Sequence, residues 1–288
     1  MADAISVSAP IGGTERTISF EAGKLAQLAD GAVLARIGDT VILATATAAR
    51  SVREGTDFFP LTVDIEERTY AAGKIPGSFF RREGKASDQA ILTDRLIDRP
   101  LRPSFPEGFR NEVHIVGTVV GADQINPHDV LAINAASAAL MISGIPFDGP
   151  IGAVRVAYTT EGAWTPHPSF EEGEESTFEL VVAGRALSDD PEAEIAIMMV
   201  EAGGTEKSWS YYEEGAPKVT EEVLASGLEA SKQWIHESIN LQRQLVEAYV
   251  AARGPIEPIP FSTFSDYEPD VWEKVEKGMG SIGPRAAT

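Results

Sequence analysis

The segment Lys74–Lys85 holds the side chains best suited to chemistry in this sequence. Two adjacent aromatic residues are followed by two guanidinium groups: Phe79, Phe80, Arg81 and Arg82. Glycine and proline residues around them predict a loop shaped by its backbone. Aromatic rings stack on unpaired bases, at about 1–3 kcal/mol per base, and arginines bind the phosphates. The pattern therefore favours a grip on single-stranded nucleic acid, with a hydrophobic loop anchor as the alternative.

Three further arginines follow this loop. Arg95 and Arg99 are four residues apart and share one face of a predicted helix, and Arg102 comes just after that helix. Planar guanidinium groups that converge on one area suit phosphate oxygens. Asp94 and Asp98 provide the alternative, because they could bind the same arginines in structural ion pairs. Both interpretations stay open at this point.

Metal and nucleophile chemistry have little support. The chain has no cysteine, which excludes thiolate metal sites, disulfides and cysteine catalysis within it. The four histidines are scattered, and His114, in an apolar strand, is predicted to be a hydrogen-bonded core residue. Asp64 and Glu66 share a strand face and are interpreted as solvent-exposed, and the glutamates of residues 171–175 as a solvated surface. We therefore expect no catalytic residue and no metal ligand in this chain.

The charge is distributed unevenly. The formal net charge is −20, yet residues 68–110 contain nine basic and five acidic residues and carry +4. A local field attracts a polyanion even when the whole molecule repels it. The sequence therefore predicts one surface for an anionic ligand in an otherwise acidic protein.

The order of predicted elements indicates an α+β fold, a mixed sheet with helices packed on one side. A hairpin is predicted around Gly38-Asp39, a half-buried strand over residues 60–66, and a helix from Asp88 to Arg99 that Ser87 caps and Pro100 ends. We further expect strands at 112–120, 151–158, 177–183 and 195–201 and helices at 129–143, 218–253 and 267–277.

The domain organisation follows from a change in pattern after Gly204. Residues 1–204 are expected to form one core domain, and residues 205–288 an incomplete all-α linker domain with a disordered tail from about residue 278. Residues 1–13 lack a secretory signal, and the longest apolar stretch is too short and too polar to span a membrane. We therefore expect a soluble cytoplasmic protein.

Four motifs resemble the first core domain of bacterial polynucleotide phosphorylases. They are long, ungapped and in the order typical of that family: Phe58–Asp64, Tyr70–Gly84, Asp94–Pro103 and Ser143–Gly152. The resemblance implies a ribonuclease PH-like core followed by a helical domain. It also implies 3′-to-5′ phosphorolysis of RNA, with release of nucleoside diphosphates, by a ring of three chains around an RNA channel.

In that family the loop at Phe79, Phe80, Arg81 and Arg82 matches the one that holds the RNA strand. Arg95, Arg99 and Arg102 match arginines implicated in RNA contact near the active site. The resemblance places the magnesium ligands and the serines that bind the co-substrate, inorganic phosphate, in a second ribonuclease PH-like core. Here Thr177 stands where a ligand carboxylate would be expected.

We therefore expect this chain to be part of a longer enzyme and inactive in isolation. Its expected partners are single-stranded RNA, the second core and the homotrimer mates. Two alternatives remain open: a stand-alone RNA-binding or assembly module, and a self-sufficient enzyme of the ribonuclease PH type.

Overall fold

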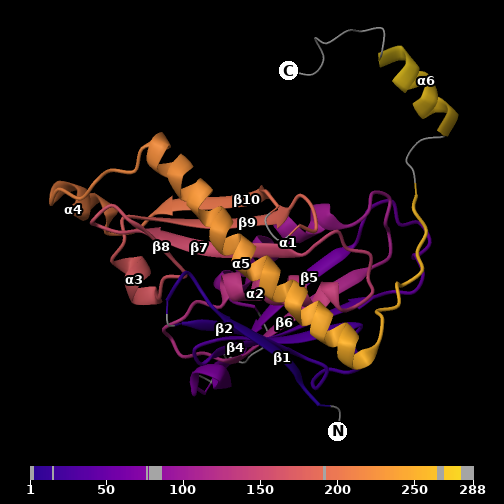
Figure 1. Ribbon diagram of the computed structural model, residues 1–288, viewed down its shortest axis with the longest axis horizontal. Helices are drawn as coiled ribbons and strands as arrows, with labels where there is room; N and C mark the ends of the chain where they lie inside the picture. The colour runs from indigo at the N-terminus through magenta and orange to yellow at the C-terminus, as the bar shows by residue number, and fades with distance from the viewer. Residues whose placement is uncertain are drawn as a thin grey trace.

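A computed structural model describes residues 3–14, 16–75, 77, 86–190, 193–264 and 269–279. Their strands form two sheets, and helices lie between and across these sheets (Figure 1). The predicted α+β class with a mixed sheet is confirmed. The expectation of one sheet with helices on one side is wrong, because the last strands pair among themselves and enclose a helix against the first sheet.

The first sheet has six strands in the order β1-β2-β3-β4-β6-β5. Neighbours are antiparallel except β5 and β6, which are parallel, so the sheet is mixed. The strands are β1 (Ile5–Pro10), β2 (Thr17–Ala22), β3 (Gly31–Ile37), β4 (Thr40–Ala48), β5 (Leu61–Glu67) and β6 (Val113–Gly121). Gly38 has a φ of 56° and forms, with Asp39, the predicted two-residue turn between β3 and β4.

The second sheet is antiparallel, in the order β10-β9-β7-β8. Its strands are β7 (Ile151–Tyr158), β8 (Trp164–Pro166), β9 (Phe178–Ala186) and β10 (Ile195–Gly204). The glutamates of residues 171–175 are not in a loop, since most belong to the short helix α3 (Phe170–Glu174). Ser169 and Glu172 close a capping box at its start, which explains why so acidic a segment is helical.

Helix α2 (Asp129–Met141) fills the space between the two sheets. It is buried around its circumference and packs against β3, β4 and β7. Its alanines allow this close approach, as the sequence predicts. Asn134 is fully buried on α2, where it donates to the Ala153 carbonyl (3.0 Å) and accepts from the Ala153 amide (2.8 Å). These bonds join α2 to β7.

Helix α1 (Asp88–Leu101) lies against β5 and carries two of the predicted arginines. The Ser87 side chain caps it by accepting from the Ala90 amide at 2.9 Å. The predicted stop at Pro100 is wrong, because the helix continues to Leu101 and then tightens into the 3-10 turn η2 (Arg102–Ser104). Pro100 has no backbone N–H to donate to the preceding turn, and α1 ends one residue after it.

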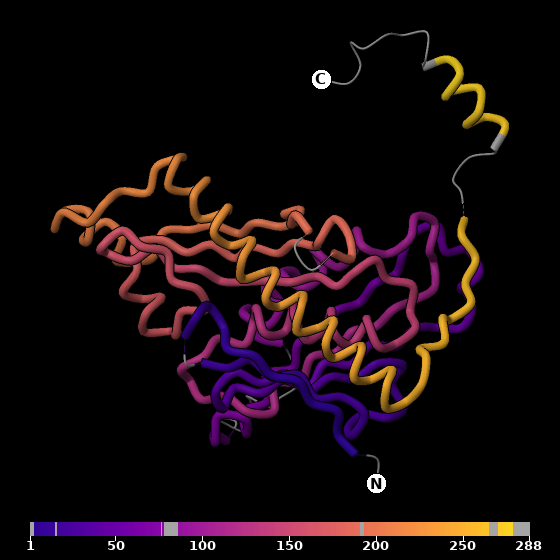
Figure 2. Tube along the Cα trace, viewed as in Figure 1, coloured from indigo at the N-terminus to yellow at the C-terminus, as the bar shows by residue number. Residues whose placement is uncertain are grey.

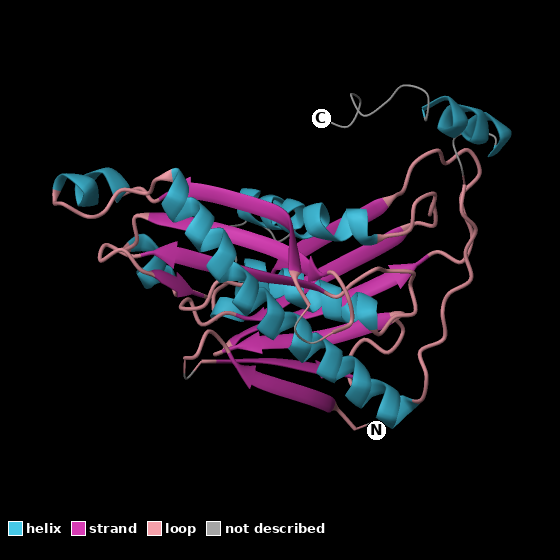
Figure 3. Ribbon diagram, turned by 45° about the horizontal axis from the view of Figure 1, so that its top comes forward, coloured by secondary structure: helices cyan, strands magenta, loops and turns pink. Residues whose placement is uncertain are grey.

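Helix α5 (Glu221–Arg253) crosses the strands of both sheets (Figure 3). Ile235 and Ile239 pack into the second sheet, and Leu241 and Leu245 join the main core. The region after Gly204 is helical, as predicted, with α4 (Ser208–Glu213) and α6 (Pro269–Met279) in addition to α5. A domain boundary at residues 204 and 205 remains a prediction, since α5 shares the core of the strands before it.

Candidate functional site

The first predicted binding loop is only partly described. Phe79, Phe80, Arg81 and Arg82 lie outside the described residues, so their RNA-binding role stays a prediction. Before them, the Lys74 ammonium donates to the Gln124 side chain at 3.2 Å. The loop leads into the capped start of α1, and the outer surface of this helix is the candidate site.

Arg95 lies on the exposed surface of α1. Within the described part of the chain, its guanidinium makes no hydrogen bond or ion pair. Ile91 and Leu92, one turn earlier, are also exposed, at 38% and 56% of their surface. Arg95 therefore offers a cation beside apolar surface and needs to break no contact with described residues to bind an anion.

Arg99 shares the helix face of Arg95 but forms an ion pair with Glu201 on β10. About half of each side chain is exposed, 50% for Arg99 and 58% for Glu201. Pairs this exposed contribute about 0–1 kcal/mol to stability. Arg99 can therefore exchange Glu201 for a phosphate at little cost.

Arg102 is held by protein groups on several sides. Its guanidinium donates to both Asp98 carboxylate oxygens, at 2.6 and 3.0 Å, and to the carbonyls of Phe59 and Leu61. It also lies 5.7 Å from the centre of the Phe59 ring. The ion-pair interpretation of the sequence applies to Arg102, and its role in RNA contact stays a prediction.

The carboxylates beside α1 do not all pair with arginines. Asp94 accepts a 2.6 Å hydrogen bond from the Ile65 amide of β5. Burial raises the pKa of Asp94 to about 6; the Ile65 bond opposes this rise, and the charges of Asp64 and Glu67 add to it. Asp94 is therefore mostly ionised at neutral pH and becomes protonated as the pH falls through about 6, which then removes a negative charge beside Arg95.

Two histidines, one on β6 and one just before α2, contact carboxylates of β5. His114 lies 2.7 Å from Asp64, and 45% of its side chain is exposed. The prediction of a core histidine is wrong, because His114 points to the outer face of the sheet, although it is hydrogen-bonded. His128 lies 3.2 Å from Glu67, and its hydrogen bond lowers the pKa of Glu67 against the effect of burial, with help from Ser87.

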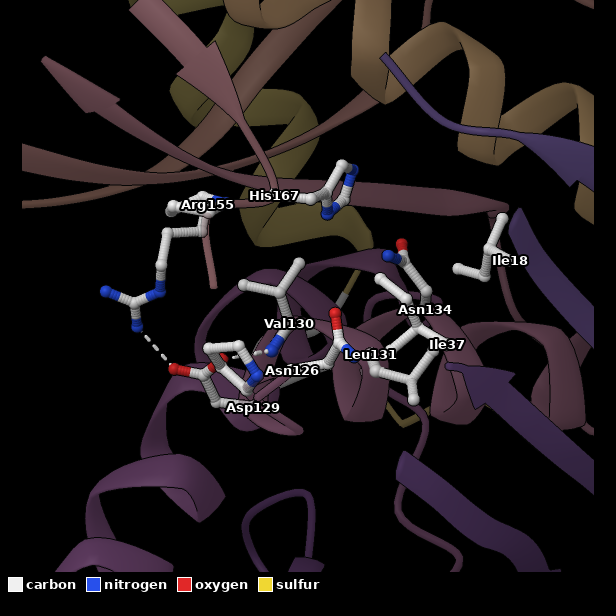
Figure 4. A pocket seen from close by; sticks show the side chains of 11 residues that line it. Ile18, Ile37, Asn126, Asp129, Val130, Leu131, Asn134, Arg155 and His167 are labelled. Atoms are coloured by element: carbon white, nitrogen blue, oxygen red, sulfur yellow. Dashed lines mark hydrogen bonds and ion pairs between the residues drawn. The ribbon is translucent and has the colours of Figure 1, made fainter. Parts of the chain in front are cut away.

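A largely buried charged cluster between the two sheets was not predicted from the sequence. Arg155 on β7 pairs with Asp129 at the start of α2 (Figure 4), and it also pairs with Glu179 on β9 at 2.9 Å. Burial disfavours the charge of Arg155, but the two carboxylates raise its pKa. Each residue comes from an element that is mostly apolar in sequence, so no local pattern indicated the cluster.

A cavity of about 20 Å³ adjoins this cluster, lined among others by Asn126, Asn134 and His167 (Figure 4). Burial and the nearby Arg16 lower the pKa of His167 to about 4, so the ring is neutral at physiological pH. The volume suits one water molecule and no larger ligand. The buried cluster therefore links α2 to the second sheet and is not a substrate site.

Comparison with known proteins supports the motif-based resemblance. Residues 14–146 match the family model of the 3′ exoribonuclease family, domain 1. Two relatives are called polyribonucleotide nucleotidyltransferase. The one from Acidothermus cellulolyticus is 51% identical over 95% of this chain and 34% of its own length, and the one from Salinispora arenicola is 54% identical over 90% and 32%.

Residues 14–146 thus resemble domain 1 of the 3′ exoribonuclease family, and the chain is similar to part of the polyribonucleotide nucleotidyltransferases. It spans about a third of the length of these relatives. The fold agrees with the solved structure of rice (Oryza sativa) Rrp46, with a TM-score of 0.61 at 17% identity over 80% of this chain and 94% of that one. No helix in the described ranges combines the length and apolar character needed to cross a membrane.

The RNase_PH domain described here does not present a metal centre. Among the described residues, no three histidine or carboxylate side chains are grouped so that they could hold an ion. Thr177, at the position where the resemblance suggests a ligand, is fully buried and donates to the Tyr158 carbonyl at 3.1 Å. Thr177 and the described carboxylates therefore do not fit a magnesium ion, and no reaction step through such an ion is assigned to the described residues.

Proposed function

We propose that this chain is the first, non-catalytic core of a phosphate-dependent 3′-to-5′ exoribonuclease, together with the start of its helical linker domain. In this proposal the chain holds single-stranded RNA while a second ribonuclease PH-like core performs phosphorolysis. The observation that carries the proposal is the exposed Arg95 on α1, beside the exchangeable Arg99, in a relative of polyribonucleotide nucleotidyltransferases.

The chemistry requires an anion-binding surface more than a nucleophile. Inorganic phosphate attacks the terminal phosphodiester, and the protein must position and neutralise anionic oxygens. Arg95 and Arg99 suit the positioning of the RNA backbone. Magnesium and inorganic phosphate are expected to act at the second core, since Thr177 is engaged within the fold.

The proposed setting follows the resemblance of the motifs. We expect the working enzyme to be a cytoplasmic ring of three chains, with Phe79, Phe80, Arg81 and Arg82 facing its RNA channel. Arg102 would lie at the end of the same surface, one turn after Arg99. The most direct structural check is whether these side chains face one shared opening in the assembled ring.

Binding of a fluorescently labelled single-stranded oligoadenylate tests the role of Arg95. We expect Arg95→Gln to weaken binding and to lower the slope of log affinity against log salt by about 0.7 for one lost phosphate contact. Arg36→Gln is the matched control, because Arg36 is an exposed arginine on β3 outside residues 68–110. An unchanged affinity and slope for Arg95→Gln would contradict the proposed surface.

Reconstitution separates this proposal from its alternatives. The chain is mixed with a separately expressed second core and poly(A), phosphate and magnesium, and the release of nucleoside diphosphate is measured. Release only in the mixture supports the proposal. Release by the chain alone would identify a self-sufficient enzyme, and no release in either sample would identify an RNA-binding or assembly module.

A further inference from the structure

A groove that shares Arg102 with the predicted binding residues brings exposed aromatic rings next to arginines. It lies between the loop that precedes β5, the segment between η2 and β6, and residues 255–264, which we call the strap. Its volume is about 540 Å³, within the range of small-molecule sites, and its walls include Phe58, Arg102, Arg110 and Phe264. In Figure 2 the strap is the yellow segment that follows α5 and runs beside purple segments from the first half of the chain.

The floor of the groove is a cluster of packed phenylalanines. Phe59 lies 4.7 Å from Phe105 and 5.4 Å from Phe109, measured between ring centres. Phe105 and Phe109 are buried, whereas the two walls are open: 65% of Phe58 and 41% of Phe264 is exposed. The groove therefore has a rigid apolar base and two rings that face solvent.

Each arginine of the groove is stacked on a ring. Arg102 lies over Phe59, and Arg110 lies 5.2 Å from the centre of the Phe264 ring. Contacts of this kind hold the guanidinium plane in one orientation and contribute about 0.5–1 kcal/mol at exposed sites. Arg102 is held further by Asp98, so its position is set before any ligand arrives.

Gly108 keeps the Phe264 wall in place. Its φ is 76°, and a Cβ there would lie 2.3 Å from the Phe264 carbonyl oxygen. The Phe264 amide donates to the Gly108 carbonyl at 2.9 Å, and Phe109 and Thr263 form an antiparallel bridge. Backbone hydrogen bonds thus hold the strap against the segment between η2 and β6, so the groove is formed without a ligand.

We propose that this groove stacks an unpaired base of single-stranded RNA. This inference rests on the proposed function and adds a second RNA-binding surface to that of Arg95 and Arg99. Exposed rings next to guanidinium groups are the combination that proteins use for single strands. Arg102 follows Arg95 along α1 by about 10 Å, at 1.5 Å per residue, which roughly three stacked nucleotides span. One strand can therefore reach both Arg95 and the groove.

The charges at the groove indicate how the base is held. Asp57 and Glu107 also line it and are exposed, so they offset the two arginines. Phosphate attraction is therefore weak here, and stacking should supply most of the binding free energy. RNA binding at the groove should thus depend less on salt concentration than RNA binding at Arg95.

The test uses single-stranded oligoadenylate that carries 2-aminopurine, whose fluorescence falls when it stacks. For the Phe58→Ala/Phe264→Ala double variant of the full chain, we expect about 10-fold weaker binding and less quenching, with an unchanged salt slope. Phe170→Ala is the control, because Phe170 is 49% exposed at the start of α3 and does not line the groove. Thermal melting checks that all variants are folded.

The outcomes separate the groove from the proposed function. Normal binding and quenching by the double variant, with weaker binding by Arg95→Gln, would overturn the groove and leave the proposed function intact. A chain that binds no oligoadenylate at low salt would overturn both. Unchanged RNA binding together with altered sedimentation of the double variant would assign the groove to a protein contact and also overturn the inference.

Discussion

The three arginines on and after α1 differ in how firmly the protein holds their guanidinium groups. Arg95 has no partner among the described residues, Arg99 has one exposed carboxylate, and Arg102 has a carboxylate, two carbonyls and a ring. Binding of RNA phosphate should therefore be easiest at Arg95. The i, i+4 spacing predicts the shared face of Arg95 and Arg99, whereas Glu201, Phe59 and Leu61 come from segments distant in sequence.

Asp94 gives the protein a pH-dependent stability at the same surface. Its folded pKa, about 6, is above the ordinary value of 3.8, so the folded state binds the proton more tightly than the unfolded state. The contribution of Asp94 to stability is therefore greatest below pH 3.8 and is lost as pH rises through 6. Ionised Asp94 destabilises the fold at neutral pH.

We expect Asp94→Asn to stabilise the protein more at pH 7.5 than at pH 4.5 relative to the unmodified chain. The asparagine oxygen can still accept from the Ile65 amide, so the hydrogen bond is kept. Urea unfolding at both pH values measures the difference in the free energy of unfolding. An equal difference at the two pH values would contradict the raised pKa.

At the scale of elements, the start of α1 connects the predicted binding loop to the helix surface that carries Arg95 and Arg99. Ser87 caps the helix and also donates to Glu67 at 2.6 Å. We expect Ser87→Ala to lower the free energy of unfolding by about 1 kcal/mol and Ser87→Asn, which can still cap, to lower it less. Urea unfolding checks the order, and equal losses for both variants would show that the cap is not responsible.

Helix α5 is the element that decides whether residues after Gly204 fold independently. Ile239 is fully buried against the second sheet, while Gln244 on the same helix is exposed. We expect Ile239→Ala to cost about 2–5 kcal/mol in one cooperative transition, and Gln244→Ala to have little effect. Two separate thermal transitions would instead indicate that α5 belongs to an independent domain.

At the scale of the whole molecule, the net charge of −20 directs the polyanion to one region. We expect acidic surface such as α3 to repel RNA and the basic residues of 68–110 to attract it. We expect photo-cross-links from 4-thiouridine RNA at low salt within residues 68–110 and at the groove, identified by mass spectrometry. Frequent cross-links on α3 would contradict this electrostatic arrangement.

The local sequence pattern by itself determined many of the secondary-structure elements of this protein and the position of its basic region. Turn residues, strand alternation, helix caps and the basic island depend on neighbours in sequence, so the hairpin at Gly38, the cap at Ser87 and the helical region after Gly204 were all predictable. The motifs also indicated the resemblance to polyribonucleotide nucleotidyltransferases that the comparisons support, because long ungapped runs are specific.

Only the tertiary structure decided which charges meet. Arg155 with Asp129 and Glu179, Arg99 with Glu201, and the ring of Phe264 beside Arg110 all join segments that are far apart in the chain. Such contacts depend on the pairing of two sheets around α2 and on the path of the strap. No periodicity within a short window records that arrangement, because burial and ion pairing are properties of the packed chain.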